Sequence, residues 1–257
     1  MIRLDPTPTL LGRFARDLLA PDLAGLPEAP DLSAYGPADL AAAHHAWTER
    51  IVDEYRSVVV FAELLQRMGE CEAPFDALCA VHALVGDELR HTALCARAAG
   101  WFGPASRFEV DLAGLSLPPS DAPPLARSLE IVVREIVVAE AESVTSFLAH
   151  RDATEEPSVR AVLSAILRDE VRHAAAGLAL FDALAAMLPE GERAAVLDHL
   201  ARIEAVDRAD LRARYDDTAR GGPGRSLGAV VTPDDLAAAR AKRASLPRAD
   251  NRLPHVS

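Results

Sequence analysis

One short pattern occurs twice in this chain, and it strongly constrains the fold. Residues 87–91 read Asp-Glu-Leu-Arg-His, and residues 169–173 read Asp-Glu-Val-Arg-His. In each copy the Glu and the His are three residues apart, so on a helix their side chains project from the same face. At ordinary residue abundances this pattern arises by chance at about one position in 10⁵ or fewer. Its repetition therefore indicates two matching halves of one helical structure.

Each copy follows a second repeated stretch that begins with a glutamate. Residues 54–61 and 140–147 agree at the initial Glu and at the Ser, Val and Phe that lie three, four and seven positions beyond it. At the helical period these residues lie on one stripe, which the glutamate interrupts. Together the repeats predict six metal ligands: Glu54, Glu88, His91, Glu140, Glu170 and His173.

Four glutamates and two histidines in this order favour a dinuclear iron site. One Glu from each of two helices and Glu-x-x-His from each of two others is the ligand pattern of carboxylate-rich di-iron four-helix bundles. Iron in its higher oxidation states prefers hard anionic oxygen ligands, completed by imidazole. Four carboxylates also balance the charge of two divalent ions in an apolar bundle. We expect two Fe ions, and a mixed Mn/Fe pair stays open.

The choice of Glu140 rests on helical register, because Glu135 and Glu142 lie close to it in the sequence. On a regular helix they point about 140° and 160° away from Glu140. Only Glu140 has the Ser, Val and Phe register of Glu54. We expect the other two to be solvated or to support the ligands from outside, and replacement of Glu140 by either stays open.

The acidic and basic residues inside the repeated pattern are candidates for holding the histidines. A ligand imidazole usually donates its second N–H to a carboxylate. We expect Asp169 to hold His91 and Asp87 to hold His173, each from the opposite half. The same arrangement predicts ion pairs of these acids with two arginines, Arg90 and Arg172. The alternative is that the four charged residues form surface salt bridges.

The residues that match between the two glutamate stretches predict a substrate and dioxygen pocket. A mostly apolar wall would exclude water from the metals on the side between the first and third helices. Its predicted members are Ser57, Val58, Phe61, Ser143, Val144 and Phe147.

Long Ala-, Leu-, Arg- and Glu-rich segments predict an all-α protein. Prolines at 37, 74, 123–124 and 157 mark the starts of four long helices. The Pro-rich residues 101–122 are long enough to return along a helix of about 42 Å. Such a crossover between the second and third helices is typical of ferritin-like bundles.

The chain divides into four segments on this interpretation. Residues 1–36 form an N-terminal arm and residues 37–190 form the di-iron four-helix bundle. Residues 191–220 form a fifth helix packed on the bundle, and residues 221–257 form a short helix and a mobile tail.

Composition excludes several classes of partner and suggests a compartment. A formal net charge of −12 disfavours nucleic-acid binding, which depends on Lys and Arg neutralising phosphates. No run of about 18 apolar residues occurs, so no membrane span is expected. Three cysteines without C-x-x-C spacing indicate reduced thiols. We expect a cytoplasmic protein.

Over about residues 38–187 the repeated motifs resemble the ferritin-like di-iron carboxylate superfamily, and bacterial multicomponent monooxygenase hydroxylases in particular. The resemblance implies Glu54, Glu88 and His91 at one iron and the other three ligands at the second, with some glutamates bridging. It also implies an O2-dependent oxidoreductase.

The implied reaction is a two-electron oxidation of a small organic substrate by hydroxylation, desaturation or N-oxygenation. Its partners would be dioxygen, the substrate and an electron donor, and a homodimer is compatible with this assignment. Two other functions stay open. One is a ferroxidase or other iron-handling protein, and the other is a metal-binding bundle without turnover.

Overall fold

The computed structural model describes residues 12–13, 15–18, 28–104 and 112–245. Within these ranges every regular element is a helix and no strand occurs, which confirms the predicted all-helical class. Much of the predicted N-terminal arm, part of the predicted crossover and the predicted mobile tail lie outside the described residues. None of the described helices combines the length and the apolar character needed to cross a membrane.

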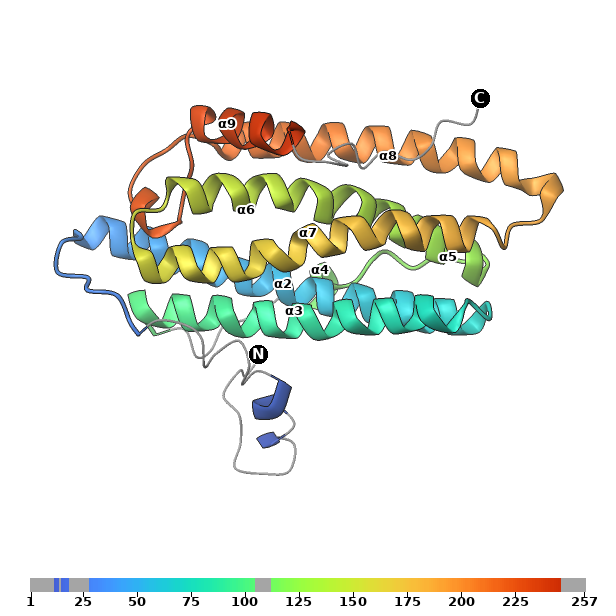
Figure 1. Cartoon of the computed structure of the whole chain (residues 1–257), viewed down its shortest axis with the longest axis horizontal. Helices are drawn as coiled ribbons and strands as arrows, with labels where there is room; N and C mark the ends of the chain where they lie inside the picture. The colour runs from blue at the N-terminus through green and yellow to red at the C-terminus, as the bar shows by residue number, and fades with distance from the viewer. Residues whose placement is uncertain (1–11, 14, 19–27, 105–111, 246–257) are drawn as a thin grey trace.

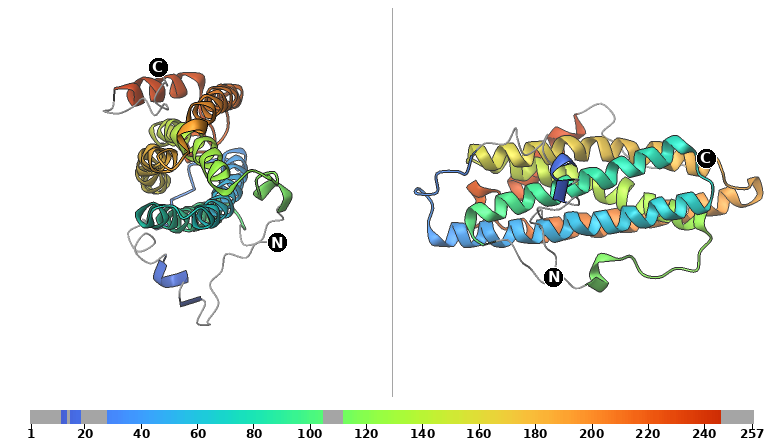
Figure 2. Two further views of the ribbon diagram at one scale, coloured as in Figure 1. Left: turned by 90° about the vertical axis from the view of Figure 1, so that its right-hand side faces the viewer. Right: turned by 90° about the horizontal axis from the view of Figure 1, so that it is seen from below.

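Four long helical stretches lie side by side along the molecule (Figures 1 and 2). The first, second and fourth are α2 (Pro37–Glu70), α3 (Phe75–Phe102) and α7 (Pro157–Ala185). The third consists of three consecutive pieces, α5 (Pro124–Ile131), η1 (Val132–Glu140) and α6 (Ala141–Ala153). Helices α2, α5 and α7 carry a proline in their first turn, as predicted.

The direction of the chain places the two sequence halves in opposite orientations along the bundle (Figure 1). Helix α3 runs antiparallel to α2, and α5 begins at the end of the molecule opposite to the end of α3 (Figure 1). The described part of the connection includes the short α4 (Leu112–Leu115), which contacts α2. The third stretch therefore runs parallel to α3, and α7 returns antiparallel to it.

Two further helices lie beside the third stretch. Helix α8 (Glu190–Thr218) contacts η1, and α9 (Pro233–Ala244) contacts α6 (Figure 1). A short 3₁₀ turn, η2 (Arg225–Leu227), connects them. The side chain of Thr232 accepts a hydrogen bond from the Asp235 amide and so caps the start of α9. These helices cover the third stretch from outside.

The third stretch differs from the regular α-helix that the sequence predicted. Its middle nine residues, Val132–Glu140, form a π-helix, which has wider turns than an α-helix. Most of the buried side chains in this segment are valine or isoleucine. Such π segments are rare, and they occur frequently at functional sites. Here the segment ends at one of the predicted metal ligands, Glu140.

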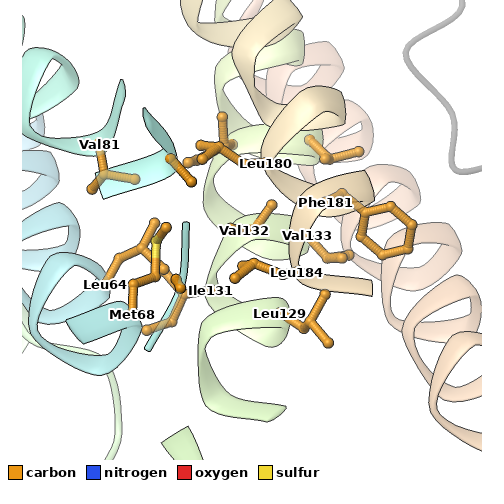
Figure 3. Close-up of a cluster of buried hydrophobic side chains, with 14 of the residues drawn as sticks. Leu64, Met68, Val81, Leu129, Ile131, Val132, Val133, Leu180, Phe181 and Leu184 are labelled. Atoms are coloured by element: carbon orange, nitrogen blue, oxygen red, sulfur yellow. The ribbon is translucent and has the colours of Figure 1, made fainter. Parts of the chain in front are cut away.

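Apolar side chains fill the bundle in separate layers along its length. One layer, shown in Figure 3, includes Leu64 and Met68 of α2 and Leu180 and Leu184 of α7. A second layer, towards the other end, contains Trp47, Ile51, Leu94, Val159, Val162 and Ile166 among its buried members. On α2, α3 and α7 the predicted ligands fall between the members of these two layers. The polar site is thus enclosed by apolar packing at both ends.

Gly177 of α7 allows that helix to pack tightly against the π-helix. A Cβ atom built at Gly177 would lie 2.8 Å from Cγ2 of Ile136 and 3.3 Å from its carbonyl carbon. Real side chains do not tolerate the first of these distances. Because Ile136 is fully buried and branched at Cβ, it has little freedom to move.

We therefore expect Gly177→Ala to lower the free energy of unfolding by about 1 kcal/mol or more, since overpacking outweighs the better helix propensity of alanine. Gly100→Ala is the control, because nothing lies within 4 Å of the Cβ position there. That variant should raise stability by about 0.5 kcal/mol. Urea unfolding of both variants measures the difference, and an equal effect would contradict the predicted close contact.

Candidate metal centre

The six predicted ligands converge in the middle of the bundle, and all are nearly inaccessible to solvent. Their exposed fractions are 7% for Glu54, 1% for Glu88, 0% for His91, 6% for Glu140, 2% for Glu170 and 1% for His173. Charged and polar side chains are seldom buried to this extent unless they are paired or bind a metal.

These side chains form two overlapping groups that could hold a metal ion. One group consists of Glu54, Glu88, His91 and Glu170, and the other of Glu88, Glu140, Glu170 and His173. Within each group one ligand atom per residue lies within 4.8 Å of the others. Glu88 and Glu170 belong to both groups, so these two carboxylates lie between two potential metal positions.

Both imidazoles turn the same nitrogen towards the carboxylates. Nδ1 of His91 lies 3.4 Å from both Glu54 Oε2 and Glu170 Oε1. Nδ1 of His173 lies 3.2 Å from Glu88 Oε1 and 3.2 Å from Glu140 Oε2. The ring centroids are 5.7 Å apart. The sequence repeat thus corresponds to a matched pair of half-sites in space.

The outward-facing nitrogens contact the aspartates of the opposite half, as predicted. Nε2 of His91 lies 3.3 Å from Asp169 Oδ2, and Nε2 of His173 lies 3.0 Å from Asp87 Oδ2. An aspartate in this position fixes the orientation of the ring and leaves Nδ1 available for a metal. Arg172 pairs with both aspartates, and Arg90 pairs with Asp87. The aspartates are 3% and 8% exposed, so they are not in surface salt bridges.

Burial and mutual repulsion govern protonation in this cluster. Burial raises the pKa of Glu54 to about 8, and it raises the pKa of Glu140 well above its usual value. For His173, nearby Glu140 and Glu88 overcome burial and raise the pKa to about 10. The pKa of His91 rises for the same reason, chiefly through Glu88. Without a metal ion, protons therefore neutralise part of the negative charge.

The donor atoms fit a metal ion in a way that ordinary hydrogen bonding does not explain. Among the described residues, Nδ1 of His91 and Oε1 of Glu88 are fully buried and form no well-aligned hydrogen bond, although each lies within 3.4 Å of another group of the cluster. A buried polar atom without a partner costs free energy. Carboxylate oxygen and imidazole nitrogen together suit iron, manganese or zinc. The residues therefore fit a metal ion of this group.

Two neighbouring glutamates lie outside the cluster. Glu135 binds Arg56 of α2 through both oxygens, at 2.9 and 3.1 Å. Glu142 is only 1% exposed and accepts hydrogen bonds from Arg208 and Arg212 of α8. Neither belongs to the groups that could hold a metal. Of the two alternatives expected for Glu142, burial excludes the solvated one, because α8 covers that side of the third stretch.

The predicted pocket residues lie in several different environments. Phe61 belongs to the first apolar layer, and Val144 belongs to a separate cluster of α6 and α7 residues with Leu236 and Ala239 of α9. Phe147 is partly buried against two clusters. Ser57 and Val58 are half-buried. That these side chains line a path to the metals stays a prediction.

One of those residues also has a polar role that the sequence did not indicate. The Ser143 hydroxyl donates to Oε2 of Glu170 and lies near the carbonyl of Glu140. It therefore helps to orient a carboxylate shared by both groups.

Tyr215 of α8 is a second residue near the centre that the sequence did not indicate. It is half-buried, and burial together with the charges of Glu142 and Glu170 raises the pKa of its hydroxyl. A polar α8 sequence without a repeated motif gave no signal for it.

Comparison with family models, curated proteins and solved structures gives no match for this chain. The interpretation of the centre therefore depends on its own residues and their geometry.

The protonation of the cluster predicts how stability of the metal-free protein depends on pH. Between pH 7 and 8.5 the folded chain holds protons on Glu54 and His173 that the unfolded chain has released. When the folded state binds more protons, stability falls as pH rises. With a chelator present, the urea midpoint should therefore decrease across this range.

Glu54→Gln removes a group that binds one of these protons in the folded state. The urea midpoint of this variant should therefore decrease less steeply between pH 7 and 8.5. Glu49→Gln, an exposed site on the same helix, serves as the control and should leave it unchanged. A midpoint that rises between pH 7 and 8.5 in the wild-type protein would contradict the predicted protonation.

Proposed function

We propose that this chain is a ferritin-like bundle that holds two iron ions and activates dioxygen for the two-electron oxidation of a small organic substrate. The observation that carries the proposal is the pair of overlapping ligand groups that share Glu88 and Glu170. Two shared carboxylates between two imidazoles suit two ions held close together, rather than one ion in a closed cage.

Charge balance supports two divalent ions over one. Four glutamates carry four negative charges, which two divalent ions would neutralise in a site where each of these residues is at most 7% exposed. One ion would leave two buried carboxylates to be neutralised by protons. A mixed Mn/Fe pair would satisfy the same balance and the same ligands.

Each ligand has a specific place in this proposal. Glu54 and His91 would help to hold one ion and Glu140 and His173 the other, and Glu88 and Glu170, which belong to both ligand groups, would contribute to holding both ions. When bound, the pair of ions supplies two electrons for the reduction of dioxygen. Asp87 and Asp169 would keep the two imidazoles oriented, and Ser143 would hold a bridging carboxylate in position.

The surroundings of the centre favour oxidation of an organic substrate over iron storage. Apolar layers lie on both sides of the ligands. Exclusion of water protects a reactive oxidised centre until a substrate reacts with it. Hydroxylation, desaturation and N-oxygenation all fit such a site. An electron donor would return the ions to the reduced state after each turnover.

The proposal predicts the metal content of the protein. Anaerobic titration with Fe²⁺ should saturate at two ions per chain, as counted by elemental analysis. Glu88→Ala, which removes a shared ligand, should lose at least one ion. Glu135→Ala changes a glutamate that pairs with Arg56 and should leave the count at two. Saturation of the wild-type chain at one ion would contradict the dinuclear site.

Exposure of the loaded protein to dioxygen separates the enzyme from an iron-handling protein. Optical and Mössbauer spectra should show that the two iron ions are coupled. Each pair of ions should be oxidised only once. Sustained oxidation of many Fe²⁺ ions per chain, with formation of a mineral, would instead support a ferroxidase. Binding of two ions with no reaction would support a metal-binding bundle without turnover.

The aspartates that contact the histidines should control metal affinity without controlling the fold. Asp87→Asn and Asp169→Asn keep the shape of the side chain but remove the charge that orients the imidazole. Each should lower metal affinity by about 10–100-fold, measured by competition with a chelator. Circular dichroism should stay unchanged. Wild-type affinity in both variants would show that these contacts do not support the metal site.

A further inference from the structure

The two half-sites have repeated sequences but different backbones. Glu54 lies within the regular helix α2, whereas Glu140 is the last residue of the π-helix η1. In an α-helix each residue turns the side-chain direction by about 100°. Any change in the register of η1 would therefore rotate Glu140 away from His173, so the π segment needs something to hold it.

Arg208 of α8 contacts the third stretch on both sides of Glu140. Its Nη2 donates to the main-chain carbonyl of Val137, three residues before Glu140, at 3.0 Å. Its Nη1 donates to Oε1 of Glu142, two residues after Glu140, at 3.0 Å. One planar guanidinium thus fixes the main chain and a side chain at the junction of η1 and α6.

This contact belongs to a buried network that joins α8 and α9 to the junction. Arg208 is 7% exposed and also donates to Glu204 of its own helix at 3.0 Å. Arg212 donates to the same oxygen of Glu142 at 2.8 Å, and Arg243 of α9 lies 3.6 Å from it. The carboxylate of Glu142 therefore has arginine partners on both α8 and α9.

Stability alone is a weak explanation for such a network. Removing paired charges from water costs about as much free energy as their attraction provides. Apolar side chains of the same volume often stabilise a folded protein equally well. What the network provides is a fixed geometry, because three arginines converge on one carboxylate. The α2 half of the bundle shows no corresponding contact of α8 or α9 with Glu54 among the described residues.

We propose that Arg208 is a positioning residue for the metal centre: it holds the π-helical register of η1 and so keeps Glu140 directed at the half-site of His173. The inference rests on the proposed function, since it assigns Arg208 to one of two ion positions. It makes the two positions unequal, with the Glu54 position independent of α8 and the Glu140 position dependent on it.

The test compares Arg208→Met with a matched variant, Arg127→Met. Arg127 of α5 is also a buried arginine, 5% exposed, that donates to a carboxylate and to a main-chain carbonyl. Its partners are Glu63 and Pro118, and neither belongs to the groups that could hold a metal. Both variants lose a buried ion pair, so both should be less stable. Only Arg208→Met removes the contact at the π-helix.

Two measurements distinguish positioning from general stability. The first is anaerobic Co²⁺ titration followed by visible absorption, in which each ion contributes a spectrum set by its ligands. Arg208→Met should lower the affinity for one of the two Co²⁺ ions by at least about 10-fold and alter the spectrum of that ion. The affinity for the other ion and its spectrum should stay unchanged. The second is amide hydrogen exchange of the metal-free protein, which should become at least 10-fold faster in residues 132–141 and stay unchanged in residues 46–55. Arg127→Met should show neither effect.

Arg208→Lys keeps the positive charge and can donate hydrogen bonds, but it lacks the forked guanidinium, so it should recover part of both effects. It replaces Arg208→Met if that variant does not fold. Wild-type Co²⁺ binding and exchange in Arg208→Met, or equal changes in Arg127→Met, would overturn the inference. If the wild-type chain itself binds fewer than two Co²⁺ ions, the dinuclear proposal fails. The hydrogen-exchange comparison then still decides whether Arg208 holds η1.

Discussion

The structure depends on the burial of four glutamates and two histidines at the centre of a helical bundle. Charges removed from water this completely must be neutralised, either by protons or by bound cations. The raised pKa values of Glu54 and Glu140 show the first solution in the metal-free chain. The arrangement of donors in two overlapping groups suits the second. The rest of the bundle keeps water and competing partners away from these six side chains.

The surrounding elements restrict the centre in different ways. Apolar layers close the bundle on either side of it, and the aspartates of each half hold the imidazole of the other. This exchange makes the halves depend on one another, so neither half forms a complete site alone. Close packing of Gly177 on Ile136 and the contact of Arg208 with Val137 both act on η1. The backbone that carries Glu140 is therefore held from both α7 and α8, and it is π-helical where the other three glutamates lie on regular α-helices.

Much of this arrangement could be predicted from the sequence, because a repeat with helical spacing specifies which side chains share a face. The six converging residues, the cross-half aspartates and the helix starts at Pro37, Pro124 and Pro157 followed from local rules. The π-helix did not, since its register depends on packing against α7 and α8 rather than on its own residues. For the same reason Glu142 was expected to be solvated or to support the ligands, and it proved to be buried against Arg208. Tertiary contacts of a helix without a repeated motif leave no signal in a single sequence.

The central claim is that the six side chains bind two metal ions, and anomalous diffraction at the iron edge tests it most directly. Crystals grown anaerobically with Fe²⁺ should show two anomalous peaks per chain in the middle of the bundle. Each peak should lie about 2.0–2.3 Å from oxygen or nitrogen atoms of the ligands, with Glu88 and Glu170 reaching both. A single peak, or no peak between α2, α3, η1 and α7 with the histidines still paired to the glutamates, would contradict the account.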